Sequence, residues 1–160
     1  MTNTIIMFVH LMALVVAAGS SFFGLVLLWP RISKQDDGET LDEHSASYQI
    51  MDLLAPTVLV CLLLLIGSGV YYMMENYTEQ VNLKDGYYNY LGIKLIFVVA
   101  AFLLSLYQTF GLRAGIAHLD LRPENREQVR PTIEKMKYLG GITLVAILFA
   151  ASLGIFLARY

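Results

Sequence analysis

The sequence predicts an all-α protein, an integral membrane four-helix bundle whose successive helices run up and down. Of its 160 residues, 57% are hydrophobic and 15% are charged, whereas a soluble domain has about 45–50% apolar and about 25% charged residues. The mean hydropathy is +0.59. Four apolar runs are each long enough to cross roughly 30 Å of hydrocarbon, which takes about 20 helical residues. The runs do not alternate apolar and polar residues as the strands of a membrane barrel do, so helices are expected.

The first span is predicted over residues 5–29, where His10, Ser20 and Ser21 are the polar interruptions. The segment Ala17-Ala18-Gly19 resembles the small-residue cleavage site of a signal peptide. No Lys or Arg precedes the run, however, and it continues to Trp29. We therefore interpret this segment as a membrane span.

Three further spans are predicted over residues 53–74, 90–112 and 138–158. The connections between them are short, which predicts a single transmembrane domain over residues 1–160. Because proline is favoured in the first turn of a helix, Pro131 is expected to start a helix that runs into the fourth span.

Basic residues predict the orientation of the bundle. Eight of the eleven Lys and Arg residues lie in the first and third connections, and only two lie in the second connection and at the C-terminus. Loops rich in Lys and Arg face the cytoplasm, so both termini are expected on the non-cytoplasmic side. Tyrosines gather at the predicted outer boundary as an aromatic belt, namely Tyr71, Tyr72, Tyr77, Tyr87, Tyr88, Tyr90 and Tyr160.

The composition also excludes several classes of protein. A single cysteine, Cys61, cannot form an internal disulfide, which rules out a disulfide-stapled scaffold. The net charge of −2 provides no basic surface for nucleic acid. No zinc-ligand spacing, phosphate-binding loop or dinucleotide glycine motif is present. The partner that the sequence predicts is the lipid bilayer.

Small residues indicate how the helices pack. In the fourth span they recur every four residues, which lets another backbone approach closely. We expect a homo-oligomer or a larger membrane complex to form through this span. The first span carries Ala13, Ala17 and Gly24 on the same face as His10, and this smooth face suits either a neighbouring helix or a planar cofactor. The stripe of the fourth span consists of Ala146, Ala150, Gly154 and Ala158.

His10 and Lys94 are the ionisable side chains well inside the apolar runs, and such groups are candidates for a functional role. His10 either bonds to a neighbouring carbonyl or tyrosine or ligates a metal or haem. Lys94 either extends its ammonium toward the membrane surface or takes part in the same site. Met7, Met73 and Met74 are predicted at the same depth. No catalytic residue is predicted.

A polar line on one face of the third span is predicted to point into the bundle. Gln108 is expected to bond across to Ser20, Ser21 or Thr57. The line consists of Lys94, Ala101, Ser105 and Gln108.

Several short motifs together resemble a known family. The first span, which bears His10 and closes with Gly24-Leu25-Val26-Leu27-Leu28-Trp29-Pro30-Arg31, resembles the first helix of HemJ-type protoporphyrinogen oxidases and of the related copper-resistance-D membrane domains. Met51-Asp52 in the second helix and Lys94-Leu95 in the third are similar too. The resemblance implies a four-helix membrane bundle that binds b-type haem through His10. Ser105-Leu106-Tyr107 stands where that family has a histidine, so the resemblance extends to the fold more than to the oxidase reaction.

Three functions follow as hypotheses. The first is a haem-binding, redox-associated membrane protein with His10 as an axial ligand and Met73, Met74 or Lys94 opposite. The second is a non-catalytic accessory subunit of a larger membrane complex, packed through the fourth span. The third is a copper-handling membrane protein that uses Met7, His10, Met73 and Met74, because imidazole and thioether ligands suit Cu(I). The expected location is the bacterial inner (cytoplasmic) membrane.

Overall fold

Four long helices make up the described part of the structure, a computed structural model that describes residues 2–30, 46–76, 86–114 and 126–157. Within these ranges the chain is helical almost throughout and contains no strand. The segments are α1 (Thr2–Phe23), continued by the π-helical turn η1 (Gly24–Leu28); α3 (Ala46–Asn76); α4 (Tyr87–Leu106), continued by the π-helical turn η2 (Tyr107–Leu112); and α6 (Arg126–Leu157).

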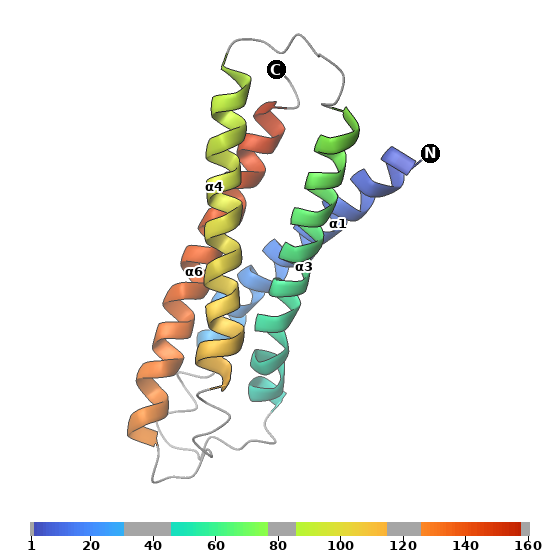
Figure 1. Cartoon of the computed structure of the whole chain (residues 1–160). Helices are drawn as coiled ribbons and strands as arrows, with labels where there is room; N and C mark the ends of the chain where they lie inside the picture. The colour runs from blue at the N-terminus through green and yellow to red at the C-terminus, as the bar shows by residue number, and fades with distance from the viewer. Residues whose placement is uncertain (1, 31–45, 77–85, 115–125, 158–160) are drawn as a thin grey trace.

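The helices form an up-down bundle, which confirms the predicted fold class (Figure 1). The most extensive contacts are between α1 and α3 and between α4 and α6. In Figure 1, α1 crosses behind α3 at an oblique angle, and the N-terminal end of α1 diverges from the other helices. The start of α1 and the end of α6 lie at the same end of the bundle, which we call the terminal end. The start of α3 and the start of α6 lie at the opposite end.

Each of the four helices contains a segment long and apolar enough to cross a membrane. These segments are Thr4–Leu28, Asp52–Glu75, Tyr87–Leu112 and Pro131–Leu157, in close agreement with the predicted spans. The chain is therefore a multi-pass membrane protein by the length and composition of its helices.

Two of the helices extend beyond the apolar runs that predicted them. Helix α3 begins at Ala46, before the predicted span, and α6 begins at Arg126, so that Pro131 lies inside a helix rather than in its first turn. Apolarity marks the part of a helix that lies in hydrocarbon, whereas a helix end is set by backbone hydrogen bonding. Helix α4 begins directly after Gly86, whose φ of 92° is a left-handed conformation that favours glycine.

The two π-helical turns lie toward the end of the bundle opposite the termini. In η1 the N–H of Trp29 bonds to the carbonyl of Gly24, and in η2 the N–H of Arg113 bonds to the carbonyl of Gln108. Each turn widens its helix locally, and π-helical turns inside α-helices are frequent at functional sites. Neither π-helical turn was predicted from the sequence.

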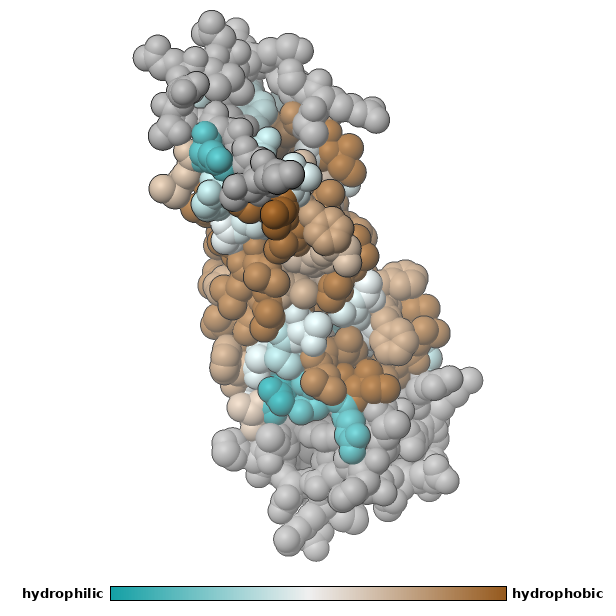
Figure 2. Space-filling model, turned by 90° about the vertical axis from the view of Figure 1, so that its right-hand side faces the viewer, coloured by the Kyte–Doolittle hydropathy of each residue, from teal (hydrophilic) through white to brown (hydrophobic). Residues whose placement is uncertain are grey.

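Buried residues form two clusters along the axis of the bundle. Small side chains such as Ala13, Ala17 and Ala101 belong to the first cluster, and Trp29 and Met136 belong to the second. Many large apolar side chains point outward instead, and Figure 2 shows them as a broad hydrophobic surface around the middle of the molecule. A lipid-facing surface of this kind is what a membrane bundle requires, because its exterior is solvated by acyl chains.

Candidate functional site

His10 is held by a hydrogen bond between α1 and α3. Its Nδ1 atom lies 2.7 Å from the Oγ atom of Ser68. The hydroxyl of Ser68 lies 2.5 Å from the carbonyl oxygen of Leu64 and 3.2 Å from that of Leu65, and it donates its one hydrogen to these carbonyls. With that hydroxyl hydrogen directed to the carbonyls, the serine oxygen is available to accept from His10, an arrangement that matches the tautomer with its hydrogen on Nδ1 and its lone pair on Nε2.

Glycines make room for the two ionisable side chains of this region. A Cβ atom at Gly69 would stand 3.6 Å from Cε1 of His10, so α3 packs closely against the imidazole ring. A Cβ atom at Gly154 would stand 3.3 Å from Nζ of Lys94, so α6 provides the space that the ammonium occupies. His10 of α1 therefore lies against α3, and Lys94 of α4 lies against α6. We call His10, Ser68 and Lys94 the imidazole site.

The side chains of the predicted sulfur ligands are partly or largely exposed. Met7 and Met74 are 46% and 70% exposed, and Met73 is half-buried. In the part of the chain that the structure describes, no group of three or more His, Cys, Asp or Glu residues is arranged to hold a metal ion.

The smooth face of α1 is filled by other helices rather than open. Ala13 is 5% exposed and Ala17 is fully buried, and both belong to a core cluster that also contains Leu62, Ala101 and Ala146. The prediction that this face suits a neighbouring helix is confirmed. Its alternative use, as the platform for a planar cofactor, does not agree with this packing.

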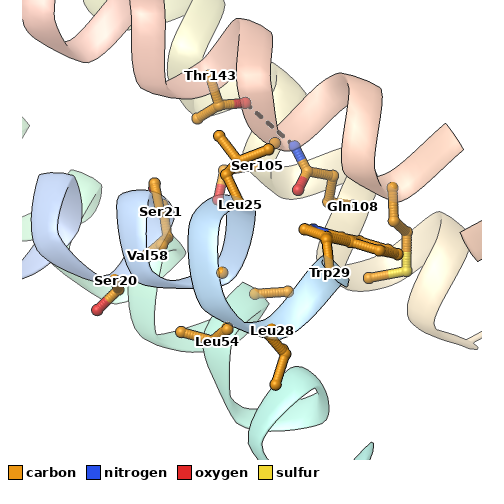
Figure 3. A pocket seen from close by; sticks show the side chains of 14 residues that line it. Ser20, Ser21, Leu25, Leu28, Trp29, Leu54, Val58, Ser105, Gln108 and Thr143 are labelled. Carbon is orange, nitrogen blue, oxygen red and sulfur yellow. Dashed lines mark hydrogen bonds between the residues drawn. The ribbon is translucent and has the colours of Figure 1, made fainter. Parts of the chain in front are cut away.

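A cavity with a mixed apolar and polar wall lies between the two core clusters, near the end of α1 (Figure 3). Its volume is about 60 Å³, and all four long helical segments contribute to its wall. Ser105, which is 2% exposed, belongs to this wall, as the polar line on the third span predicts. The polar members of the wall are Ser20, Ser21, Ser105, Gln108 and Thr143.

Gln108 has a different partner from those expected. Its Nε2 donates to Oγ1 of Thr143 at 3.1 Å, and Thr143 donates in turn to the carbonyl of Leu139 at 2.9 Å. The prediction that Gln108 bonds to Ser20, Ser21 or Thr57 was wrong. The physical reason is that α4 and η2 pack against α6 more closely than against α1.

An ion pair joins α3 to the end of η2. Arg113 forms a two-pronged pair with the carboxylate of Asp52, in which Nη2 lies 2.8 Å from Oδ2 and Nε contacts Oδ1. Both side chains are 39% exposed. The ammonium of Lys135 lies over the ring of Tyr107 in η2, with its Nζ atom 5.5 Å from the ring centroid. The ion pair of Asp52 and Arg113 contributes to the alignment of the second and third spans at this end.

Comparison with protein-family models, with curated proteins and with solved structures gives no match for this chain. The resemblance to the HemJ-type family therefore stays a prediction, and a functional proposal depends on the residues described above.

Several residues of these sites were missed by the sequence analysis. Ser68 carried a signal, because Gly67-Ser68-Gly69 is a small polar interruption of an apolar run. Thr143 carried none, because single threonines are common in membrane helices.

Proposed function

We propose that this multi-pass membrane protein ligates a metal centre through Nε2 of His10, with a b-type haem as the first candidate and a redox-associated role. The observation that carries the proposal is the hydrogen bond between Nδ1 of His10 and Ser68. Histidines that ligate metals in proteins commonly donate their other ring N–H to a fixed acceptor, which sets the ring orientation and the tautomer. Ser68 is such an acceptor, since its own hydrogen is directed to α3 carbonyls.

The imidazole donor fits a haem iron, whereas the cavity near the other end of α1 does not fit the macrocycle. The cavity of about 60 Å³ lies near the other end of α1 and has no histidine in its wall, and small-molecule sites have volumes of about 300–1,000 Å³. A haem held by His10 would therefore lie at the flank of α1, outside the packed core. His10 would hold the iron, Ser68 would orient the ring, and Lys94, Met73 or Met74 would supply a second ligand. A bound haem supplies one-electron chemistry.

The packing of the interior favours a second candidate, a non-catalytic accessory subunit of a larger membrane complex. Ala13 and Ala17 are buried among other helices, so this face of α1 is occupied by neighbouring helices. Copper handling through Met7, His10, Met73 and Met74 is a third candidate. It is supported by thioether and imidazole ligands that lie toward the same end of the bundle.

The orientation and location are part of the same proposal. The distribution of Lys and Arg supports termini on the non-cytoplasmic side, and the resemblance supports a bacterial inner membrane. With this orientation the imidazole site lies in the outer half of the bilayer.

The test is a visible absorption spectrum and a metal analysis of the protein purified gently from its own membrane. We expect a Soret band in the wild type, its loss in His10→Ala, and a weakened or shifted band in Ser68→Ala. Ser152→Ala is the matched control, because Ser152 is exposed and donates to its own helix at Leu148.

Two other results would redirect the assignment. Bound copper without a Soret band, lost in His10→Ala, would replace haem by the copper-handling function. A wild type that holds neither haem nor metal would overturn ligation, and stoichiometric partner proteins in that preparation would then establish the accessory-subunit function.

A further inference from the structure

We propose that the cavity between η1 and η2 is a hydration site that holds a small cluster of water molecules against its polar side chains and joins α1 to the α4 and α6 pair. A water molecule needs about 10–15 Å³ of a cavity of this kind together with two to four polar partners. The volume of about 60 Å³ meets the first condition. This inference does not depend on a metal at His10.

The chemistry of the wall indicates a neutral, hydrogen-bonding occupant. Three serines, a threonine and a glutamine line the cavity, and none of its lining residues is ionisable. An ion would therefore find no countercharge among them. An acyl chain would leave buried polar groups without partners, which is unfavourable by about 1–3 kcal/mol for each such group. Water satisfies these groups without either cost.

Hydrogen-bonding capacity remains after the direct bonds are made. Ser21 donates to the carbonyl of Ala17 at 2.8 Å, so its oxygen can still accept. Gln108 uses one of its two N–H donors on Thr143, which leaves a donor and the amide oxygen. Ser105, at 2% exposure, presents its hydroxyl from the α4 side. Donors and acceptors on opposite walls are the arrangement that bridging water requires.

The two π-helical turns border the same cavity from different helices. Gly24, Leu25 and Leu28 of η1 contribute to the wall, as does Gln108 of η2. A π-helical turn breaks the regular ladder of backbone bonds, and in membrane helices ordered water is one means of satisfying the freed groups. Hydration of the cavity accounts for the occurrence of two such turns at one depth.

The cavity lies between two closely packed pairs of helices. Helix α1 packs mainly on α3, and α4 packs mainly on α6. Ser21 of α1 and Ser105, Gln108 and Thr143 of the other pair all line this cavity (Figure 3). The water cluster therefore bridges the two pairs beside their direct contacts.

The experiment measures magnetisation transfer from water to the full-length protein in phosphatidylcholine and phosphatidylglycerol bilayers by solid-state NMR. We expect rapid transfer to Ser105, Gln108 and Thr143. Ala101 and Ala146 serve as internal controls because they are buried in the apolar core cluster. Transfer at the three polar residues no faster than at these alanines, or transfer from lipid acyl chains instead, would overturn the proposal.

A variant separates cavity water from water that enters from the membrane surface. Ser105→Val replaces the hydroxyl by methyl groups inside the cavity, and we expect it to reduce the water transfer to Gln108 and Thr143 at least twofold. Ser152→Val is the control on the exposed face of α6 and should leave the transfer unchanged. If Ser105→Val does not insert, Gly140→Ala tests the same point, since its Cβ would stand 3.9 Å from Oε1 of Gln108. Undiminished transfer in the folded variant would contradict a discrete water site.

Discussion

His10 illustrates what a single residue gains from its surroundings in this bundle. A histidine inside a membrane span needs a polar partner, and the hydroxyl of Ser68 provides it at 2.7 Å. The same hydroxyl is directed by the α3 carbonyls, so the ring has a defined tautomer. Lys94 obtains its place differently, from the absence of a side chain at Gly154.

Gly154→Leu is expected to displace the ammonium of Lys94 and to destabilise the bundle. A Cβ at this position already stands 3.3 Å from Nζ, and overpacking of an interior typically destabilises by about 1–3 kcal/mol. Thermal unfolding in detergent micelles measures the effect. The matched control is Gly67→Leu, because a Cβ at Gly67 has no atom within 4 Å. Equal unfolding midpoints for the two variants would show that Gly154 does not accommodate the lysine.

At the scale of the helices, packing depends on small residues and on few polar contacts. The predicted stripe of the fourth span faces the interior, with Ala146 at 6% and Ala150 at 5% exposure. The fourth member, Ala158, lies outside the described residues. These alanines belong to the contact of α6 with the rest of this chain, whereas assembly with a partner through this span stays a prediction.

Ala150→Leu is expected to lower the unfolding midpoint in detergent, since the larger side chain has no space between α6 and its neighbours. The expected destabilisation is about 1–3 kcal/mol. Leu148→Ile is the control, because Leu148 is 51% exposed on the opposite face of the helix. A similar tolerance at both positions would mean that the alanine faces lipid.

The pair of Asp52 and Arg113 is expected to contribute modestly to the alignment of α3 with η2. Both side chains are 39% exposed, and exposed ion pairs have coupling energies of roughly 0.2–1 kcal/mol. A double-mutant cycle with Asp52→Asn and Arg113→Gln, followed by unfolding in detergent at low and at high salt, measures this energy. The coupling should decrease with salt, because ions screen exposed charges. A coupling near zero at low salt would show that the pair does not contribute to stability.

The whole molecule has the surface of a membrane protein, with large apolar side chains around its middle (Figure 2). Four segments of sufficient length and apolarity, one in each long helical element, make this a multi-pass bundle. The direction in which the bundle crosses the membrane depends on the charges of its loops.

Thiol labelling in intact cells tests the proposed orientation. A cysteine introduced by Lys84→Cys should react with a membrane-impermeant maleimide, and one introduced by Glu124→Cys should react after the cells are opened. Both positions lie outside the described residues. The native Cys61 is 7% exposed and provides little background. The reverse labelling pattern would place the termini in the cytoplasm.

The four apolar segments, their approximate limits and the presence of His10 and Lys94 inside them can be predicted from the order of residues alone. These properties are local, because a helix in lipid must satisfy its own backbone and its length must match the hydrocarbon. Three contacts depend on the tertiary structure. Ser68 hydrogen-bonds to the histidine, Gly154 leaves space for the lysine, and Gln108 bonds to Thr143. The burial of Ala13 and Ala17 of α1 by other helices likewise depends on the tertiary structure. Lipid offers no hydrophobic preference for one apolar face over another, so helix partners are selected by close packing and by polar contacts between residues far apart in the chain.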